Sequence, residues 1–356
     1  MELQSSTSKN KTEKSKLSSA LQIIISIIIV VLCVYFAIKD IDFKVLWEII
    51  KNANYIWVFL SIPVIVLSHW VRALRWRRIL KPIKYVKSIY PLFASVMIGY
   101  ALNAITPRGG EFVRPLSFSR REKVSYSSTF ATIVVERVID LITLALLFIL
   151  VMLFFNNTIT NLISFELDPN KLILYSILFL VLIIFAFYPP VIKFLLAKIV
   201  KPISLKLFDR LTDLFNKFTV GLSIIKAPSE YFMLIIESIT IWILYCLPMY
   251  FMFFSFNFHN IANLGFPDAI LLLVVSGIAT TFAPTPGALG VYHLAIQTAM
   301  VVIYKITPED ALAYATLTHA INYLIQLGLG GWYFLKENSF KKSSLYLKPQ
   351  PDDNNT

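Results

Sequence analysis

The sequence predicts an all-α polytopic membrane protein with about six full spans and two oppositely oriented re-entrant broken segments, which together form an inverted repeat. Three observations predict this fold class. Hydrophobic residues make up 57% of the 356 residues and the mean hydropathy is +0.70, which excludes an ordinary soluble domain and a disordered chain. Several apolar runs reach the ~20 residues that a helix needs to cross a bilayer. Two further runs are interrupted by proline and glycine.

Six apolar runs are long enough to be spanning helices. The first follows a basic start, as a signal peptide would, but it is long and lacks a small-residue cleavage site, so we expect a retained helix. Two other stretches place apolar residues on one helical face and are expected to lie on the membrane surface. The expected spans are 18–38, 55–76, 127–155, 171–189, 229–256 and 309–334, and the surface helices are 41–54 and 191–222.

Basic residues gather between the apolar spans and predict the orientation. With the N-terminus inside, 27 of the 33 Lys and Arg fall in cytoplasmic stretches and five fall in outer stretches. The net charge of +12 therefore indicates membrane topology and not nucleic-acid binding. We expect one transmembrane domain over 17–338 in a bacterial-type cytoplasmic (inner) membrane, between disordered cytoplasmic tails at 1–16 and 339–356.

This orientation determines how the two broken segments enter the membrane. Residues 88–107 lie between a span that ends inside and a span that starts inside, so they must enter from the cytoplasm and return. By the same argument, residues 268–304 must enter from the outside and return. The two halves then run in opposite directions, which is the inverted repeat expected for alternating access. Irregular backbone at membrane depth also needs a polar cavity or protein around it.

The first break, with the residues that follow it to 114, joins an apolar entry to a charged exit. Its glycines let a ligand approach the backbone closely, and its arginines offer planar forks that suit phosphate. We expect a substrate-binding role, and the alternative is a cytoplasmic loop whose arginines only hold the orientation. The candidate residues are Asn103, Arg108, Gly109, Gly110, Glu111 and Arg114.

The second break places two prolines before a half-helix that begins near Gly287. Proline stops a helix and glycine then allows the turn. The positive N-terminal end of the half-helix would point into the membrane, where it suits an anionic group such as a lipid phosphate. His293 would titrate or hydrogen-bond there, with a structural role as the alternative. The candidate residues are Pro286, Gly287, Gly290, Tyr292 and His293.

Three charged residues lie near mid-depth in the span predicted at 127–155. Glu136 and Asp140 share a helix face, and Arg137 can pair with Asp140 at i,i+3. An isolated charge at that depth costs at least about 2.5–3.5 kcal/mol, so these residues must face one another or a polar cavity. We expect a gate or charge relay, with Glu237 as a further member, and the alternative is an ion-pair clasp between helices.

The sequence indicates no other chemistry. It contains no Walker A loop, no nucleophile elbow and no metal-ligand spacing of His and Cys. Cys33 and Cys246 lie inside apolar spans, where they are expected to act as small apolar residues. We therefore expect no catalytic residue, no metal, no cofactor and no nucleic-acid partner.

At these motifs the chain resembles the lysylphosphatidylglycerol synthetase-type transmembrane family, also called the flippase-like domain family. The resemblance rests on 103–116, on Glu136-Arg137 with Asp140, and on 284–292, and it covers about 18–335. His293 departs from the glutamate that the family often has. Members of the family move lysylated phosphatidylglycerol between leaflets and carry a cytoplasmic aminoacyltransferase domain, which we expect to be missing here.

We therefore expect a lipid translocator and not an enzyme. The resemblance implies movement of an anionic or aminoacylated phospholipid, or of a polyprenyl-phosphate-type lipid. The partners would be membrane lipids, a second copy of the chain or a lipid-synthesis enzyme. Two alternatives stay open, namely a membrane enzyme of lipid head-group modification, such as a phosphatidylglycerol lysyltransferase, and a small-solute or ion transporter.

Overall fold

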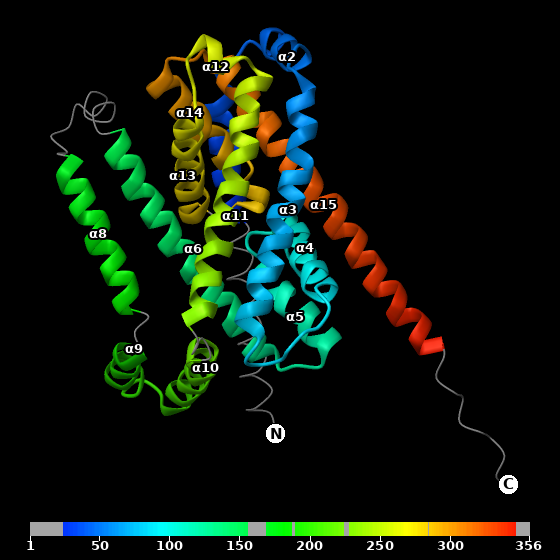
Figure 1. Ribbon diagram of the computed structural model, residues 1–356, viewed down its shortest axis with the longest axis vertical. Helices are drawn as coiled ribbons and strands as arrows, with labels where there is room; N and C mark the ends of the chain where they lie inside the picture. Colours follow the sequence, from blue (N-terminus) through cyan, green and yellow to red (C-terminus); the bar gives the residue numbers. More distant parts are fainter. Residues whose placement is uncertain (1–23, 156–168, 187–188, 224–227, 284, 347–356) are drawn as a thin grey trace, which may run out of the picture.

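The computed structural model describes the chain except for residues 1–23, 156–168, 187–188, 224–227, 284 and 347–356. All regular secondary structure in the described residues is helical, which confirms the predicted all-α membrane fold. Figure 1 shows long helices in a bundle, with α2 (Phe43–Lys51) and α12 (Phe258–Ile261) at one end. The other end holds α5 (Gly110–Glu122), α9 (Pro189–Leu195) and α10 (Leu205–Ser223).

A bent pair of helices opens the described chain. Helix Ile24–Ile38 is followed by α2 (Phe43–Lys51), and the two axes differ by 87°. α2 begins after Asp42, whose carboxylate accepts hydrogen bonds from two backbone N–H groups of the first turn. The sharp turn agrees with the surface helix predicted at 41–54. Residues 18–23 of the first predicted span lie outside the described residues.

α3 (Tyr55–Leu80) and α11 (Pro228–Ser255) form the most extensive helix pair of the bundle. The start of α3 is bonded to the end of α11, because the backbone N–H of Asn54 donates to the Ser255 carbonyl and the Ser255 hydroxyl donates to the Asn54 carbonyl. Trp57 stacks on Phe254 beside this contact, with ring centroids 4.7 Å apart. The two helices are therefore antiparallel, and α6 (Tyr126–Phe154) and α15 (Pro308–Tyr346) pack against them.

Both broken segments fold as helical hairpins. α4 (Tyr90–Ile105) and α5 (Gly110–Glu122) form one hairpin, and α13 (Phe266–Phe282) and α14 (Val291–Tyr304) form the other, joined through the short turn η2 (Pro286–Ala288). The first hairpin enters the bundle from the end that holds α10 and the second from the end that holds α12 (Figure 1). α4 contacts η2, so the two tips meet inside the bundle.

Helix length and composition support part of the predicted span count. Of the six expected spans, α3, α6 and α11 are long and apolar enough to cross a membrane. The segment Pro286–Tyr304 passes the same test, but α14 itself has 14 residues. At 1.5 Å per residue, α14 is about 21 Å long, shorter than the ~30 Å apolar layer of a bilayer. This length agrees with a hairpin arm and not with a full span.

Two predictions at the periphery were wrong. The single surface helix predicted at 191–222 is divided into α9 (Pro189–Leu195) with the π turn η1 (Leu196–Val200), and α10 (Leu205–Ser223). Pro202 falls in the turn between them, where its missing N–H interrupts the helix. α15 continues to Tyr346, so residues 339–346, which were assigned to a disordered tail, are helical; they contain no proline or glycine. α8 (Pro169–Ala186) lies beside α6.

Candidate functional site

The tip of the first hairpin depends on close backbone packing. The side-chain oxygen of Asn103 accepts a hydrogen bond from the backbone N–H of Gly110 at 2.8 Å. A Cβ added to Gly110 would lie 1.8 Å from the carbonyl oxygen of Gly99, so a side chain there would separate α4 from α5. Arg108 lies in the turn with φ 56, and its guanidinium donates to the carbonyl oxygen of Thr281 in α13. The first hairpin is thus bonded directly to the second.

The tip of the second hairpin is held by α15. Gly287 has φ +57, and a Cβ added there would lie 2.5 Å from the ring of Tyr323. Nε2 of His319 donates to the Gly287 carbonyl oxygen at 2.7 Å. The Tyr323 hydroxyl donates to the carbonyl oxygen of Ala104 in α4 at 3.2 Å. Side chains from α15 therefore satisfy backbone groups that both breaks leave free at membrane depth.

A cavity of about 540 Å³ lies where the hairpin tips meet α3, α6, α11 and α15. This volume is within the range of ~300–1,000 Å³ that is typical of ligand pockets in proteins. Both breaks contribute to its wall, as expected for a site between two inverted halves. The predicted residues that line it are Asn103, Arg108, Glu111, Arg137, Asp140, Gly287 and Tyr292.

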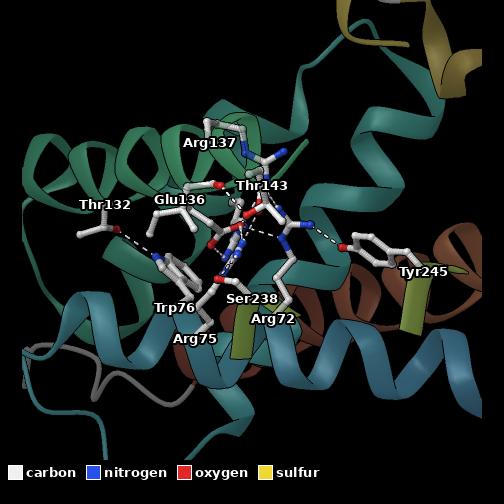
Figure 2. Close-up of polar contacts among 12 residues, drawn as sticks. Arg72, Arg75, Trp76, Thr132, Glu136, Arg137, Thr143, Ser238 and Tyr245 are labelled. Atoms are coloured by element: carbon white, nitrogen blue, oxygen red, sulfur yellow. Dashed lines mark hydrogen bonds and ion pairs between the residues drawn. The ribbon is translucent and has the colours of Figure 1, made fainter. Parts of the chain in front are cut away.

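A cluster of six charged side chains borders this cavity, and we call it the arginine cluster (Figure 2). Nε of Arg72 donates to Glu136 at 2.6 Å, and its Nη2 donates to Asp140. Nη2 of Arg75 donates to Asp140 at 2.6 Å. Nη2 of Arg137 lies 3.0 Å from Glu136 and 3.1 Å from Asp140, as its i,i+3 spacing predicts. The cluster consists of Arg72, Arg75, Arg114, Glu136, Arg137 and Asp140.

Arg114 is the member of the arginine cluster that α5 contributes. Its two terminal nitrogens donate to the two carboxylate oxygens of Glu136 at 2.9 and 2.8 Å, which is the bidentate geometry that favours arginine. Its guanidinium also lies 4.1 Å from the ring centre of Trp76. The indole N–H of Trp76 donates to the Thr132 hydroxyl at 2.9 Å, which fixes the ring. The first hairpin is thereby clamped to α3 and α6.

Burial within the arginine cluster is uneven. The side chains of Arg75 and Glu136 are fully buried, whereas the side chain of Arg137 is 39% exposed. Arg72, Arg137 and Asp140 reach the cavity wall, and Arg75, Arg114 and Glu136 lie behind them. Buried ion pairs of this kind are stable only when the partners satisfy one another. The inner members therefore hold the outer ones in place, and Arg137 is the most exposed arginine of the cluster.

Neutral polar groups surround Arg72 on the cavity side. Nη1 of Arg72 donates to the hydroxyls of Tyr100, at 2.8 Å, and Tyr245. His69, one turn before Arg72, also lines the cavity and packs against the Tyr100 ring with centroids 4.4 Å apart. Both ring nitrogens of His69 are buried and have no hydrogen-bond partner. A buried imidazole without partners is costly, so His69 calls for a further explanation.

Glu237 belongs to a separate group of ion pairs. Arg78 donates to Glu237 at 2.9 Å and to Glu230 at 2.6 Å, and Lys81 donates to Glu230 at 2.6 Å. None of these four residues lines the cavity. Glu237 is therefore an ion-pair partner between α3 and α11, away from the arginine cluster with which the sequence had grouped it.

Several predicted site residues do not reach the cavity. Gly109 and Gly110 shape the first turn, and Arg114 faces Glu136, so Arg114 is not free to hold a ligand. Gly290 packs against the helix Ile24–Ile38, since its added Cβ would lie 3.0 Å from the Val30 carbonyl oxygen. α14 begins at this point, so the backbone of Gly290 packs against that helix, whereas Tyr292 in the first turn of α14 lines the cavity. Pro286 and His293 also lie outside the lining, and the His293 ring is 4.8 Å from that of His319.

Sequence reasoning missed Arg72, Arg75 and His69, which were counted only as topological charges or minor polar residues. Arg72 and Arg75 are spaced i,i+3 and lie within the last three turns of α3, not beyond its end. This spacing places two cations on one helix face at the depth of Glu136 and Asp140. Within α6, these two carboxylates have only Arg137 as a cationic partner. A comparison of the predicted spans for opposite charges at the same membrane depth would have found these residues.

Among the described residues, no group of three or more His, Cys, Asp or Glu side chains could hold a metal ion. The cavity wall instead combines guanidinium, carboxylate, hydroxyl, amide and imidazole groups with apolar side chains, and its guanidinium groups outnumber its carboxylates. Guanidinium groups recognise carboxylate and phosphate, and hydroxyls and amides fix the orientation of such a group. The chemistry of the wall therefore favours binding of a polar, anionic group.

A family profile described as the lysylphosphatidylglycerol synthase TM region matches residues 23–330. The chain belongs to the lysylphosphatidylglycerol synthase transmembrane family. This match confirms the resemblance that the two breaks and the charged span indicated, and it includes every member of the arginine cluster. It also confirms that the chain is a membrane protein.

Relatives of this family member include archaeal membrane proteins. The UPF0104 membrane protein PH1989 of Pyrococcus horikoshii is 24% identical over 313 residues, which cover 83% of this chain and 92% of that protein. The UPF0104 membrane protein MJ1078 of Methanocaldococcus jannaschii is 29% identical over 248 residues, covering 68% and 97%. The glycosyltransferase AglD of Haloferax volcanii is 27% identical over 135 residues, covering 38% of this chain and 22% of that protein.

Proposed function

We propose that the protein translocates a lipid with an anionic head group, an anionic phospholipid or a polyprenyl-phosphate-type lipid, between the leaflets of the cytoplasmic membrane. The observation that carries the proposal is a cavity with guanidinium groups on its wall, between two oppositely directed hairpins inside an apolar helix bundle. Broken helices that meet around a polar site are the usual arrangement of a transporter with inverted halves. The arginines on its wall favour an anionic head group.

The size of the cavity suggests how a lipid would pass. A volume of about 540 Å³ accommodates a head group but not two acyl chains. The head group would therefore occupy the cavity while the chains stay in the bilayer, where they lose no hydrophobic stabilisation. Arg108 lines the cavity and donates to the Thr281 carbonyl oxygen, and we propose that its guanidinium exchanges this contact for the head-group phosphate.

We propose transport and not catalysis for the deep carboxylates. Glu136 accepts hydrogen bonds from Arg72, Arg114 and Arg137, and Asp140 accepts from Arg72 and Arg75. A carboxylate whose lone pairs are occupied by guanidinium groups is a poor general base, because a base must reach the proton that it abstracts. The lipid-modifying enzyme remains the competing function, since one relative is named a glycosyltransferase.

Charge also supports a proposed orientation. α5 and α10, together with the end of α15, lie at one end of the bundle (Figure 1) and carry many of the basic residues of the chain. Basic segments next to spans stay in the cytoplasm. We propose that this end, and with it the entrance of the first hairpin, faces the cytoplasm.

Lipid mass spectrometry on gently purified protein, followed by a leaflet-accessibility assay in liposomes made with the enriched lipid, tests the proposed function. We expect one anionic lipid to be enriched, and protein-dependent exchange that Arg108→Ala abolishes while the protein stays folded. Arg120→Ala is the matched control, because Arg120 is exposed on α5 and does not line the cavity. Normal exchange by Arg108→Ala would contradict the proposal, and product formation from a labelled sugar or aminoacyl donor would favour an enzyme.

A further inference from the structure

The arginine cluster carries more positive charge than its own carboxylates neutralise. Four guanidinium groups face two carboxylates, an excess of two positive charges. The remaining charged residues of the cavity wall are Arg108 and Glu111, which offset each other. Arginine stays protonated in proteins, so the excess cannot be removed by losing a proton. Inside an apolar bundle, uncompensated charge is costly.

The carboxylates of the cluster have little capacity left to balance this excess. One oxygen of Glu136 accepts hydrogen bonds from Arg72, Arg114 and Arg137, and its other oxygen accepts from Arg114. Nε of Arg137 is buried and has no partner, although the same side chain reaches the cavity wall. Arg137 therefore has donor capacity that the protein itself does not use.

His69 provides a second, independent observation. Its side chain is 2% exposed, it lines the same cavity, and both of its ring nitrogens lack a partner. It lies one turn before Arg72 on α3, on the cavity side of the bundle. An unpartnered imidazole N–H beside a guanidinium group can be satisfied by an anionic oxygen and not by another cation.

We propose that the cavity recognises a terminal phosphomonoester, a head group with two negative charges, through Arg137 and His69. This inference rests on the proposed function and specifies its substrate class. A phosphomonoester carries a charge of about −1.5 to −2 at pH 7 and three strong acceptor oxygens, which matches the excess of two. A phosphodiester would neutralise one charge, and a lysylated head group with a net positive charge would increase the excess.

Calorimetric titration of the purified protein with two small probes tests this inference. Hexyl phosphate and methyl hexyl phosphate share a chain and differ by one charge, at pH 8, above the second pKa of ~6 of the monoester. We expect the monoester to bind at least tenfold more tightly than the diester. Equal affinity, or tighter binding of the diester, would overturn the proposal.

Two variants identify the contacts. Arg137→Gln is expected to reduce the preference for the monoester to less than threefold, whereas Arg77→Gln, on α3 outside the cavity, should keep it. His69→Leu should lose at least threefold in monoester affinity without lowering the melting temperature, because the imidazole has no partner to lose. An unchanged monoester preference in both Arg137→Gln and His69→Leu would overturn the assignment.

A third probe distinguishes a lipid head group from free phosphate. Inorganic phosphate is expected to bind at least tenfold more weakly than hexyl phosphate, because it lacks the apolar chain. Equal affinity would overturn the lipid source. The outcomes also separate this inference from the proposed function. If the protein exchanges phosphatidylglycerol between leaflets but shows no preference for the monoester, the proposed translocator stands and the phosphomonoester substrate is wrong. If it prefers the monoester but exchanges no lipid, the phosphomonoester site stands and the translocator is wrong.

Discussion

Both hairpins break at a Thr-Pro pair followed within two residues by glycine, but they differ in charge. The first hairpin carries Arg108, Glu111 and Arg114, and Arg114 joins the arginine cluster through Glu136. The second hairpin has no charged residue between Asp268 and Lys305, and the imidazole of His319 in α15 donates to the Gly287 carbonyl oxygen in its break. A repeated backbone feature therefore supports two roles. The first half of the chain supplies the charge of the cavity, and the second half supplies neutral wall and shape.

The largest expected effect comes from unbalancing the charged half. Glu136→Gln removes a fully buried carboxylate and raises the excess from two positive charges to three. Breaking a buried ion pair of this kind costs about 3–5 kcal/mol, so the melting temperature in detergent should fall sharply. Glu237→Gln is the matched control, because Arg78 keeps Glu230 as a partner. Equal melting temperatures for the two variants would contradict a structural role of the cluster.

A smaller but clear difference is expected at the two hairpin turns. Gly110→Ala places a Cβ against a backbone carbonyl, which cannot move aside, and overpacking of this kind costs about 1–3 kcal/mol. Gly287→Ala meets the Tyr323 ring at 2.5 Å and the Ala104 carbonyl oxygen only at 3.0 Å, and it adds about 1–2 kcal/mol for its left-handed backbone. We expect both variants to melt below the wild type, with Gly110→Ala the less stable of the two.

Gly328→Ala is the control for this pair, since a Cβ added there meets no atom within 4 Å. It should melt at or slightly above the wild-type temperature, because alanine favours the helix over glycine by about 1 kcal/mol. If Gly287→Ala proved less stable than Gly110→Ala, the second turn and not the first would be the tighter contact.

The smallest effect is expected where the hairpins meet. Tyr323→Phe removes the hydrogen bond from α15 to the Ala104 carbonyl and leaves the ring in place. A single hydrogen bond contributes about 0.5–1.5 kcal/mol, so stability should change little. If this contact closes the path, leaflet exchange in liposomes should become a few-fold faster. A slower rate would show that the hydrogen bond stabilises the open form instead.

The sequence predicted the pattern of helices more fully than the composition of the site. Hydrophobic runs and paired breaks are enough to predict helices and hairpins, because both follow from local sequence. The pairing of Arg137 with Asp140 also follows from spacing along one helix. The partners that α3 provides could not be found this way, because a contact between helices depends on their relative depth. Pro202, by contrast, was a local signal for the division of the surface helix that could have been used.

The direction of individual side chains was the other information that the sequence lacked. Arg108 and Arg114 looked equivalent in the first break, yet Arg108 reaches the cavity wall and Arg114 packs over Trp76. The difference arises because α5 begins at Gly110, so Arg114 lies one turn into a helix that faces α3 and α6. Only the packing of the hairpin decides which arginine is free.

If the cavity between the hairpins is the path of the head group, a large side chain on its neutral wall should block transport. Thr280 lines the cavity on α13 and bonds only within its own helix, so Thr280→Trp fills the path without touching any charge. Phe282→Trp is the control, because Phe282 is 78% exposed on the same helix. In a liposome leaflet-exchange assay, we expect folded Thr280→Trp to lose exchange and Phe282→Trp to retain it. Exchange at the wild-type rate in folded Thr280→Trp would show that the head group does not pass through this cavity.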